Sequence, residues 1–356
     1  MLVIGQEVDL KIENLASTGK GVGFLDLDTK RAIFVDYSVP GDELKVKITS
    51  KKKAYFEAEI ITITKPSPSR RKAVCKHFQI CGACDFLHIE YSQQIKQKEL
   101  LLKFQAKKHN LDLGDFKVIE AINEYHYKDK VRKTANGFYK KRSNEIVPIK
   151  KCHIINDEFN KSVFESKQDV FVYDYAENKV SDNDGFYFYE ELKLKHNVKG
   201  FVQSNLKMNT LLIDEVLSNV VGKKVLELYC GNGNFTLPLI SKGYEVTAIE
   251  GGSLGYELLM ENLKENNLTC QTYNLDVTQH TYETYEVDTV ILDPPRAGAQ
   301  SVLDSLNCKR VIYVSCNSDN AMKDIKKSSY KIVKSVLIDM FANTKHFETV
   351  FILEKY

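Results

Sequence analysis

The sequence lacks any apolar segment long enough to cross a membrane, and its first residues do not form an export signal. No uninterrupted apolar run approaches the ~20 residues that a membrane-spanning helix requires. The first segment, MLVIGQEVDLKIEN, becomes acidic too early to be a signal peptide. The sequence also contains no internal repeats and no low-complexity tract. We therefore expect a folded cytoplasmic protein without membrane partners.

Net charge is nearly absent as well, because 50 Lys and Arg residues face 48 Asp and Glu residues. The resulting charge of +2 says nothing about partners, but its distribution does. Residues 45–72 contain nine basic and two acidic residues, and residues 93–150 contain fourteen basic and seven acidic residues. Residues 156–192 reverse this balance, with three basic and ten acidic residues. Two basic segments on a folded protein indicate a polyanionic partner, most often nucleic acid; a solvated lysine-rich surface is the alternative.

The first part of the chain predicts a small barrel, a linker, a helix and a strand-rich insertion. Residues 1–64 alternate apolar and polar positions between glycine and proline turns, which is typical of a small OB-type β-barrel. The basic, proline-containing stretch KPSPSRRK (65–72) predicts a linker. Residues 92–109 have helical spacing with Ser92 as a possible N-cap. Residues 117–195 are expected to form a strand-rich insertion.

From about residue 204 onward, apolar strand segments alternate with helical patterns, which implies a parallel α/β sheet. A chain of 356 residues is expected to form two or three domains. We predict three: an OB-type barrel over residues 1–64, a central α+β domain over 65–195, and a Rossmann-like α/β domain over 196–356.

Eight cysteines occur in a chain for which no disulfide framework is expected, because the cytosol keeps thiols reduced. Cys75, Cys81 and Cys84 have the spacing C-x5-C-x2-C, and Cys152 follows 67 residues later. Four thiolates can hold either zinc or an iron–sulfur cluster, and the spacing alone does not choose between them. Ordinary buried cysteines are the structural alternative.

A strand, a glycine-rich turn and a helix are predicted for VLELYCGNGNFTLPLI (225–240). Gly231 and Gly233 let the backbone turn tightly and approach a ligand closely. Glu250 ends the next strand, where a carboxylate can hold ribose hydroxyls, and Asp276 follows a third strand and could face an adenine. The G-x-G-N form is more similar to the S-adenosylmethionine (SAM) site of methyltransferases than to a nicotinamide site.

Three chemically capable residues are predicted at the carboxyl edge of the sheet. Asp293 ends a strand in VDTVILDPPRAG, and Cys316 ends the next strand in YVSCN. Glu348 begins the final strand, so it shares this edge if that strand runs antiparallel to its neighbour. A thiol, a carboxylate and a methyl donor suit covalent catalysis followed by proton removal. An exocyclic-amine N-methyltransferase also uses a Pro-Pro loop, but it needs neither Cys316 nor Glu348.

Residues 1–63 resemble a TRAM domain, a small RNA-binding barrel, through STGKGVGF (17–24), IFVDYSVPGDELKVKI (33–48) and AYFEAEI (54–60). The string CKHFQICGACDFLHIEYSQQIKQKE (75–99) is similar to the cluster-binding region of RNA uridine-5-methyltransferases. In that family, four cysteines hold a [4Fe–4S] cluster. The resemblance therefore implies an iron–sulfur cluster, rather than zinc, on the four cysteines, with a structural role in the central domain.

The C-terminal signatures of the same family are similar to DPPRAG (293–298), SCN (315–317) and DMFANTKHFETVFILEK (339–355). The resemblance implies that Cys316 is the nucleophile that attacks uracil C6, that Glu348 is the general base, and that Asp293 helps to hold the uracil and the donor. It further implies SAM contacts from three positions in GFVQSN (200–205) and the glycine-rich turn: Gln203, Tyr229 and Asn234. The segment NTKH (343–346) departs from the family, which often has a proline there.

The resemblance implies a SAM-dependent RNA uridine-5-methyltransferase, with a uridine of 23S ribosomal RNA as the favoured target and the transfer-RNA T loop as the alternative. A non-catalytic RNA-binding protein is a more distant alternative. The target base must leave its stack to reach the thiol. Candidate base contacts are Phe78, Phe86 and Tyr127, and candidate phosphate contacts are Lys128, Lys130 and Arg132. We expect a monomer without an obligate protein partner.

Overall fold

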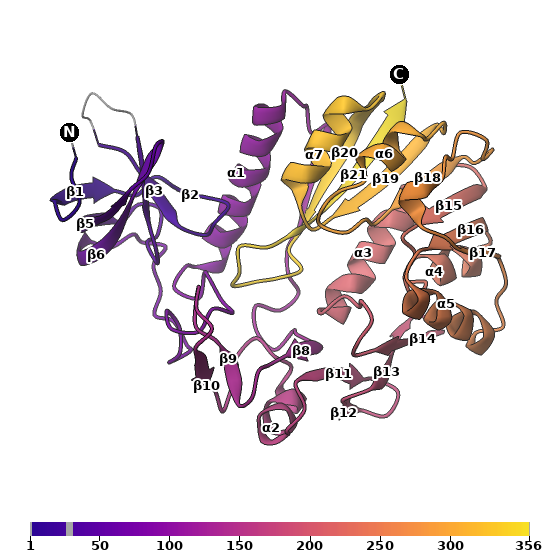
Figure 1. Cartoon of the computed structure of the whole chain (residues 1–356), viewed down its shortest axis with the longest axis horizontal. Coiled ribbons are helices and arrows are strands. Elements are labelled where there is room, and N and C mark those ends of the chain that lie inside the picture. Colours follow the sequence, from indigo (N-terminus) through magenta and orange to yellow (C-terminus); the bar gives the residue numbers. More distant parts are fainter. Residues whose placement is uncertain (1, 26–30, 356) are drawn as a thin grey trace. The chain divides into compact units, whose positions relative to one another are not determined.

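The computed structural model describes residues 2–25 and 31–355 (Figure 1). The chain divides into two compact units. Unit 1 contains Met1–Leu101, Gly137–Ile149 and Phe341–Lys345. Unit 2 contains Leu102–Asn136, Lys150–Met340 and His346–Tyr356. Among the described residues, no helix is long and apolar enough to cross a membrane.

Unit 1 begins with a six-stranded sheet in the order β1-β5-β6-β4-β3-β2. The strands are β1 (Glu7–Lys11), β2 (Asn14–Leu15), β3 (Gly21–Gly23), β4 (Ala32–Val35), β5 (Glu43–Lys51) and β6 (Tyr55–Lys65). In β5, buried Leu44, Val46 and Ile48 alternate with polar residues, which directs one face of the strand into a hydrophobic core. The alternation that predicted strands is therefore confirmed, although the two-residue strand β2 was not foreseen as a separate element.

The cysteine stretch that follows has little regular structure and pairs with a short hairpin of β9 (Gly137–Tyr139) and β10 (Ile146–Pro148). An isolated antiparallel bridge joins Cys81 to Lys140, and the amide of Gly82 donates to the carbonyl oxygen of Tyr139 at 2.9 Å. The helix α1 (Tyr91–His109) comes next and runs from unit 1 into unit 2. It begins at Tyr91, so Ser92 lies inside its first turn and is not its N-cap.

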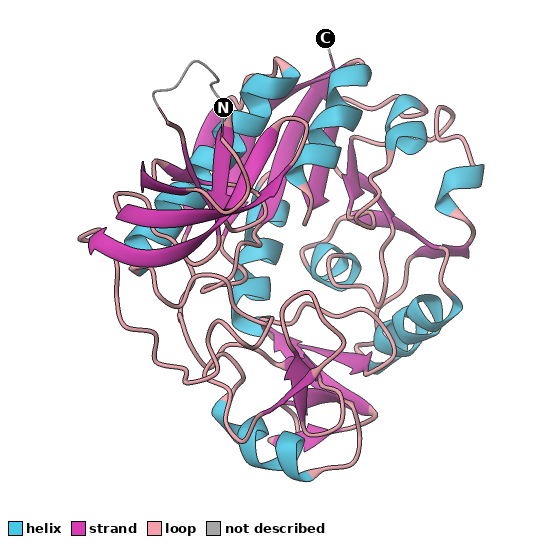
Figure 2. Ribbon diagram, turned by 60° about the vertical axis from the view of Figure 1, so that its left-hand side comes forward, coloured by secondary structure: helices cyan, strands magenta, loops and turns pink. Residues whose placement is uncertain are grey.

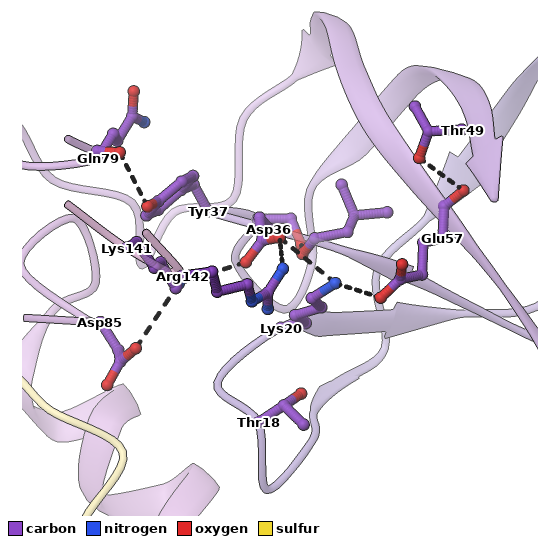
Figure 3. A network of polar contacts seen from close by, with 12 residues as sticks. Thr18, Lys20, Asp36, Tyr37, Thr49, Glu57, Gln79, Asp85, Lys141 and Arg142 are labelled. Carbon is purple, nitrogen blue, oxygen red and sulfur yellow. Dashed lines mark hydrogen bonds and ion pairs between the residues drawn. The ribbon is translucent and has the colours of Figure 1, made fainter. Parts of the chain in front are cut away.

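A network of charges connects this hairpin with the sheet inside unit 1 (Figure 3). Asp36 pairs with Lys20 at 3.4 Å, Lys141 at 3.2 Å and Arg142 at 3.3 Å, and the buried Lys20 also binds Glu57 at 2.6 Å. Burial acts to raise the pKa of Asp36, but the three cations outweigh it and lower that pKa below its usual value. The carboxylate is therefore held ionised between elements far apart in the sequence.

Unit 2 is built on an eight-stranded sheet in the order β17-β16-β15-β18-β19-β21-β20-β7 (Figures 1 and 2). Neighbouring strands are parallel except that β21 is antiparallel to both β19 and β20. The strands are β7 (Asp115–Ile119), β15 (Lys224–Leu228), β16 (Glu245–Glu250), β17 (Gln271–Asn274), β18 (Thr289–Leu292), β19 (Arg310–Ser315), β20 (Tyr330–Ile338) and β21 (Glu348–Lys355). The central strands are apolar and buried along nearly their whole length, as expected for a parallel sheet covered by helices.

The connections of the sheet carry five helices and a short 3-10 helix. They are α3 (Leu206–Ser218), α4 (Thr236–Ser241), α5 (Ser253–Glu265), η1 (Val277–Gln279), α6 (Gln300–Asp304) and α7 (Ser318–Lys327). The alternation of strands and helices predicted from about residue 204 is confirmed. The edge strand β7 was not foreseen as part of this sheet, because its partner β20 follows more than two hundred residues later in the sequence.

The sequence predicted a strand-rich insertion over residues 117–195, and most of this stretch forms the remainder of unit 2. Its first residues instead belong to β7 of the large sheet, and Gly137–Ile149 belongs to unit 1. Its strand β11 (Val170–Asp174) lies between β8 (Lys130–Arg132) and β12 (Lys179–Ser181). The hairpin of β13 (Asp184–Tyr189) and β14 (Leu192–Asn197) leads to residues 200–205 (GFVQSN), and α2 (Asp157–Glu165) precedes β11. We refer to residues 120–136 and 150–197, which carry β8, α2 and β11–β14, as the insertion.

Candidate active site

Strand order brings Asp293, Cys316 and Glu348 to one edge of the unit 2 sheet. Asp293 directly follows β18 and Cys316 directly follows β19, and these strands are parallel. Because β21 runs antiparallel to β19, its first residue lies at the same edge, where Thr349 pairs with Ser315. The conditional expectation about the direction of the last strand is therefore confirmed.

The three acidic side chains at this edge hold their protons more tightly than usual. Burial raises the pKa of Asp293 to about 7. Glu348 is only 4% exposed, and burial together with the charge of Asp293 raises its pKa well above the ordinary value. Burial and the charge of Glu348 also raise the pKa of the half-buried Cys316 thiol. Groups with perturbed pKa values in one place are typical of catalytic sites.

Arg296 is a member of this site that the sequence analysis did not single out. Burial raises the pKa values of Cys316 and Glu348, and the Arg296 guanidinium partly opposes this, on Cys316 through a hydrogen bond and its charge and on Glu348 through its charge. The carbonyl oxygen of Arg296 accepts hydrogen bonds from the side-chain amides of Asn317 at 3.2 Å and Asn320 at 2.9 Å. These bonds fix the loop after Asp293 to the start of α7. The only sequence signal was its place in the DPPRAG motif.

The glycine-rich turn after β15 has the tight conformation that its glycines predict. Gly231 and Gly233 have φ values of +55° and +91°, and a Cβ atom on Gly233 would lie 2.4 Å from the side chain of Leu237. Glu250 braces this turn, because its carboxylate accepts hydrogen bonds from the amides of Gly231 at 2.9 Å and Gly252 at 2.6 Å. The ribose contact expected of Glu250 stays a prediction.

A pocket opens beside this turn, and five of the seven predicted donor-binding residues line it. These five are Gln203, Tyr229, Gly231, Asn234 and Asp293. The other lining residues are Tyr187, Phe201, Val202, Glu227, Cys230, Asn232 and Phe235. Glu250 and Asp276 do not line the pocket. The pocket and the edge with Cys316 and Glu348 therefore share Asp293.

Asp276 has a local structural role. Its carboxylate caps η1 by accepting hydrogen bonds from the amide of Thr278 at 3.0 Å and the side chain of Gln279 at 2.7 Å. Hydrogen bonds to Thr278 lower its pKa below the usual value. Its expected contact with an adenine stays a prediction, and a carboxylate has lone pairs left for such a contact.

Glu227 is a second residue that the sequence analysis did not single out. It is 1% exposed, lines the pocket, and accepts a hydrogen bond from the Thr236 hydroxyl at 2.5 Å. Burial raises its pKa to about 8, although the bond from Thr236 acts in the opposite direction. A signal was present, because Glu227 is the single acidic residue in an otherwise apolar strand segment, VLELYC. Buried charges in strands often mark functional positions.

The predicted aromatic base contacts have other surroundings. Phe86 is 3% exposed and packs in a core cluster of unit 1, and Tyr127 is 4% exposed in unit 2. Both are core residues, so neither presents a ring on which a base could stack. Phe78 is half-buried and stacks with His88 at a ring-centroid distance of 5.1 Å.

The four predicted cluster ligands are divided between the units. Cys75, Cys81 and Cys84 belong to unit 1, and Cys152 belongs to unit 2. The amide of Cys81 donates to the carbonyl oxygen of His77 at 2.9 Å, which tightens the loop between the first two thiols. Among the described residues, no three His, Cys, Asp or Glu side chains are close enough to hold a metal ion. Four thiols are a donor set that suits an iron–sulfur cluster, and the cluster stays a prediction.

The family model described as tRNA (Uracil-5-)-methyltransferase matches residues 161–275 and 272–356, which is more than half of the chain. The chain therefore belongs to this family. A TRAM domain matches residues 2–61. The family resemblance and the TRAM-like character of the first residues, both inferred from motifs, are thus confirmed.

Curated relatives match over nearly the whole chain. The 23S rRNA (uracil(1939)-C(5))-methyltransferase RlmD of Aliivibrio salmonicida is 26% identical over 426 residues, covering 98% of this chain and 97% of the relative. The RlmD protein of Vibrio parahaemolyticus is 26% identical over 423 residues, covering 97% of this chain and 95% of the relative. A crystal structure of Pyrococcus abyssi tRNA (uracil-54, C5)-methyltransferase with S-adenosyl-L-homocysteine has the same fold, with a TM-score of 0.78 and 21% sequence identity. The match covers 97% of this chain and 99% of the other chain.

Proposed function

We propose that this protein transfers the methyl group of SAM to C5 of a uridine in RNA, and that the favoured RNA is 23S ribosomal RNA. The family supports the reaction, and relatives named as 23S rRNA methyltransferases support the target. One observation carries the proposal for the site: Asp293 lines the pocket and also influences the pKa values of Cys316 and Glu348. A donor in this pocket would thus lie next to a thiol and a base.

In the proposed reaction, the Cys316 thiolate attacks C6 of the uracil. A C–S bond forms, and the electrons of the C5–C6 double bond move onto the O4 enolate. C5 then attacks the methyl group of SAM, whose sulfonium sulfur leaves with the bonding electrons. Glu348 removes the C5 proton, the double bond returns, and the thiolate leaves C6. The reaction needs no oxidant or reductant.

The raised pKa values affect the two roles differently. A thiol with a raised pKa is a poor nucleophile at neutral pH, so the Arg296 guanidinium is needed to favour the thiolate. The raised pKa of Glu348 makes its carboxylate a stronger base toward the C5 proton. Before it can act, however, Glu348 must lose its own proton. Binding of a cationic donor next to Asp293 favours such deprotonation electrostatically.

We also propose that Cys75, Cys81, Cys84 and Cys152 hold a [4Fe–4S] cluster with a structural role, zinc being the alternative. The support is the chemistry of four thiols and their spacing in the sequence. Protein purified without oxygen should contain iron and sulfide and absorb broadly near 400 nm. Stoichiometric zinc without iron would contradict the cluster.

RNA binding is assigned to the TRAM sheet and to the basic segments of the chain. Arg132 is exposed and Lys128 is half-buried, so both remain candidates for phosphate contacts. The side chain of Lys130, in contrast, donates a hydrogen bond to the carbonyl oxygen of Gly200. We keep the transfer-RNA T-loop uridine as the alternative target, and we expect a cytoplasmic monomer without a protein partner.

The proposal is tested by incubating the protein with methyl-labelled SAM and either 23S ribosomal RNA or transfer RNA that lacks 5-methyluridine. Digestion to nucleosides should yield labelled 5-methyluridine from the ribosomal RNA. Label found in transfer RNA alone would select the T-loop alternative. Label in an exocyclic N-methyl nucleoside would replace the proposed reaction with that of the rival class.

A further inference from the structure

Residues 200–205 (GFVQSN), which we call the donor loop, are held at both ends by two adjacent residues of the insertion. Near its C-terminal end, the carbonyl oxygen of Ser204 accepts a hydrogen bond from the Asp129 amide at 2.7 Å, and the amide of Leu206 donates to the Asp129 carboxylate at 3.0 Å. At its first residue, the carbonyl oxygen of Gly200 accepts a hydrogen bond from Lys130. Gln203 lies between these anchors and lines the pocket.

Asp129 is a junction between the donor loop and the insertion. The residue is 2% exposed. Besides Leu206, its carboxylate accepts hydrogen bonds from the Asn156 side chain at 3.1 Å and the Tyr175 hydroxyl at 2.9 Å. Its carbonyl oxygen accepts a bond from the amide of Tyr173 at 2.9 Å. The carboxylate therefore satisfies three donors from three different segments.

The helix that follows the donor loop extends this connection to the glycine-rich turn. Asn205 caps the N-terminus of α3 by accepting a hydrogen bond from the Met208 amide at 3.2 Å. One turn later, the side chains of Asn209 and Asn234 exchange hydrogen bonds of 2.7 and 3.1 Å. The Tyr187 hydroxyl of the insertion also donates to Asn234 at 2.9 Å. Both walls of the pocket are thus fixed from the insertion.

We infer that Asp129 is a positioning residue that couples the insertion to the donor site, with Lys130 holding the other end of the same loop. The inference rests on the proposed function, because it assigns the pocket to SAM. Asp129 is not among the residues that line the pocket. It fixes the main chain that carries Gln203, so the donor loop loses less conformational freedom when the donor binds. RNA that engages the insertion would act on the donor site through the same bonds.

Replacing Asp129 by Asn separates this role from simple space filling. The amide has the volume of the carboxylate but offers one acceptor oxygen, so its NH2 group must face donors that the carboxylate satisfied. Leu206, Asn156 and Tyr175 cannot all keep their bonds. The Asn156 side chain cannot simply rotate, because its oxygen already accepts the amide of Glu158 at the start of α2.

Asp174 provides a matched control, because it is also buried, at 5% exposure, and also accepts main-chain hydrogen bonds. Its donors are the amides of Ala176 at 2.9 Å, Glu177 at 3.3 Å and Phe186 at 3.3 Å, all within the insertion. All three bonds meet the same oxygen, Oδ1, so an asparagine can keep them on its one acceptor oxygen. D174N therefore replaces a buried carboxylate of the insertion by an amide and leaves the bonds of Asp129 and Lys130 to the donor loop in place. A difference between D129N and D174N reports on the donors that Asp129 shares, and not on the mere loss of a buried carboxylate.

The test is calorimetric binding of S-adenosyl-L-homocysteine to the full chain, together with the KM for SAM. D129N should weaken binding about tenfold and raise the KM similarly, which corresponds to about 1.4 kcal/mol. The kcat at saturating SAM should stay within about twofold, because the reacting groups are untouched. K130M, which keeps the aliphatic stem, should weaken binding about threefold, a readout that remains if D129N fails to fold.

Equal losses in D129N and D174N would overturn the inference, as would unchanged binding in both D129N and K130M. If the wild-type protein itself binds no S-adenosyl-L-homocysteine, the proposed function fails and not the anchoring role. The wild-type measurement therefore distinguishes the two failures.

Discussion

The carboxyl edge of the unit 2 sheet and the cysteine stretch of unit 1 both collect residues that the sequence marks for chemistry, but they are constructed differently. At the edge, Asp293 and Cys316 each follow a strand that is buried along its length, so strand register decides where they lie. In the cysteine stretch, single hydrogen bonds to a hairpin, such as that from Gly82 to Tyr139, hold the chain. Topology positions the first set, and local bonds position the second.

The carboxylates of the two units differ in the same way. Asp36 in unit 1 is surrounded by cations that lower its pKa, so it is an ion-pair partner that holds elements together. Glu227 and Asp293 in unit 2 are buried without a cation close enough to offset the burial, and their pKa values rise to about 8 and about 7. Structure is stabilised by paired charges, whereas buried acids without a counterion cost stability. Such a cost is typical of sites that bind a charged ligand.

The largest effect is expected for Cys316→Ala. If topology places the nucleophile at the sheet edge, this change should abolish both the covalent RNA adduct and 5-methyluridine formation, by at least about 10⁴-fold. Cys270→Ala is the control, because Cys270 is also half-buried in unit 2 but lies outside the edge. The assay is single-turnover methylation with a denaturing gel for the adduct. A Cys316→Ala protein with normal activity would remove the thiol from the mechanism.

Glu348→Gln should have a different signature, because Glu348 acts after methyl transfer. Attack by the thiolate and methyl transfer should continue, but removal of the C5 proton should slow by about 10³-fold. The protein should then accumulate as a covalent complex with methylated RNA, visible as a slow band. Turnover at the normal rate without this band would move the base role to Asp293 or to a water molecule.

The positions of Asp293 and Cys316 were predictable from the sequence because both residues stand at the ends of apolar strands. VDTVILD and YVSC show where their strands end, and the carboxyl ends of parallel strands share an edge. The direction of β21 was open, because antiparallel and parallel last strands have the same apolar pattern. Motif spacing therefore located Asp293 and Cys316, while the pairing of Thr349 with Ser315 was needed for Glu348.

The sequence could not reveal residues that act through long-range hydrogen bonds. Asp129 contacts Asn156, Tyr175 and Leu206, which lie 27, 46 and 77 residues away. No local periodicity encodes such a junction, and the same residue in the sequence stands among lysines that suggested phosphate contacts. Arg296 was within a quoted motif, yet its influence on Cys316 follows from the folded loop. In unit 1, the strands were predictable but the bonds of the cysteine stretch were not.

Arg296→Gln should have a moderate effect that depends on pH. Loss of the guanidinium should raise the pKa values of Cys316 and Glu348 further, so both groups would ionise only at higher pH. Activity near pH 7 should fall about tenfold and recover partly near pH 9. Lys323→Gln removes an exposed cation of α7 and is the control. A pH–rate profile that keeps its shape and position in Arg296→Gln would show that the guanidinium does not act on these groups.

The smallest expected effect compares the two kinds of carboxylate directly, through the pH dependence of stability. The pKa of Glu227 is raised from 4.5 to about 8, so its contribution to stability is fully present below about pH 4.5 and is lost as pH rises toward 8. Glu227→Gln removes this loss. Without donor, the variant should match the wild type near pH 5 and exceed it by about 2 kcal/mol near pH 9, because only the wild type must ionise a buried acid.

Asp36→Asn should behave oppositely. Because the pKa of Asp36 is lowered, its contribution to the free energy of unfolding is present above its ordinary pKa of 3.8 and is lost as the solution becomes more acidic. Denaturant melts of the two variants over this pH range should therefore diverge from the wild type at opposite ends. If both diverged at the same end, the contrast between paired and unpaired carboxylates would be wrong.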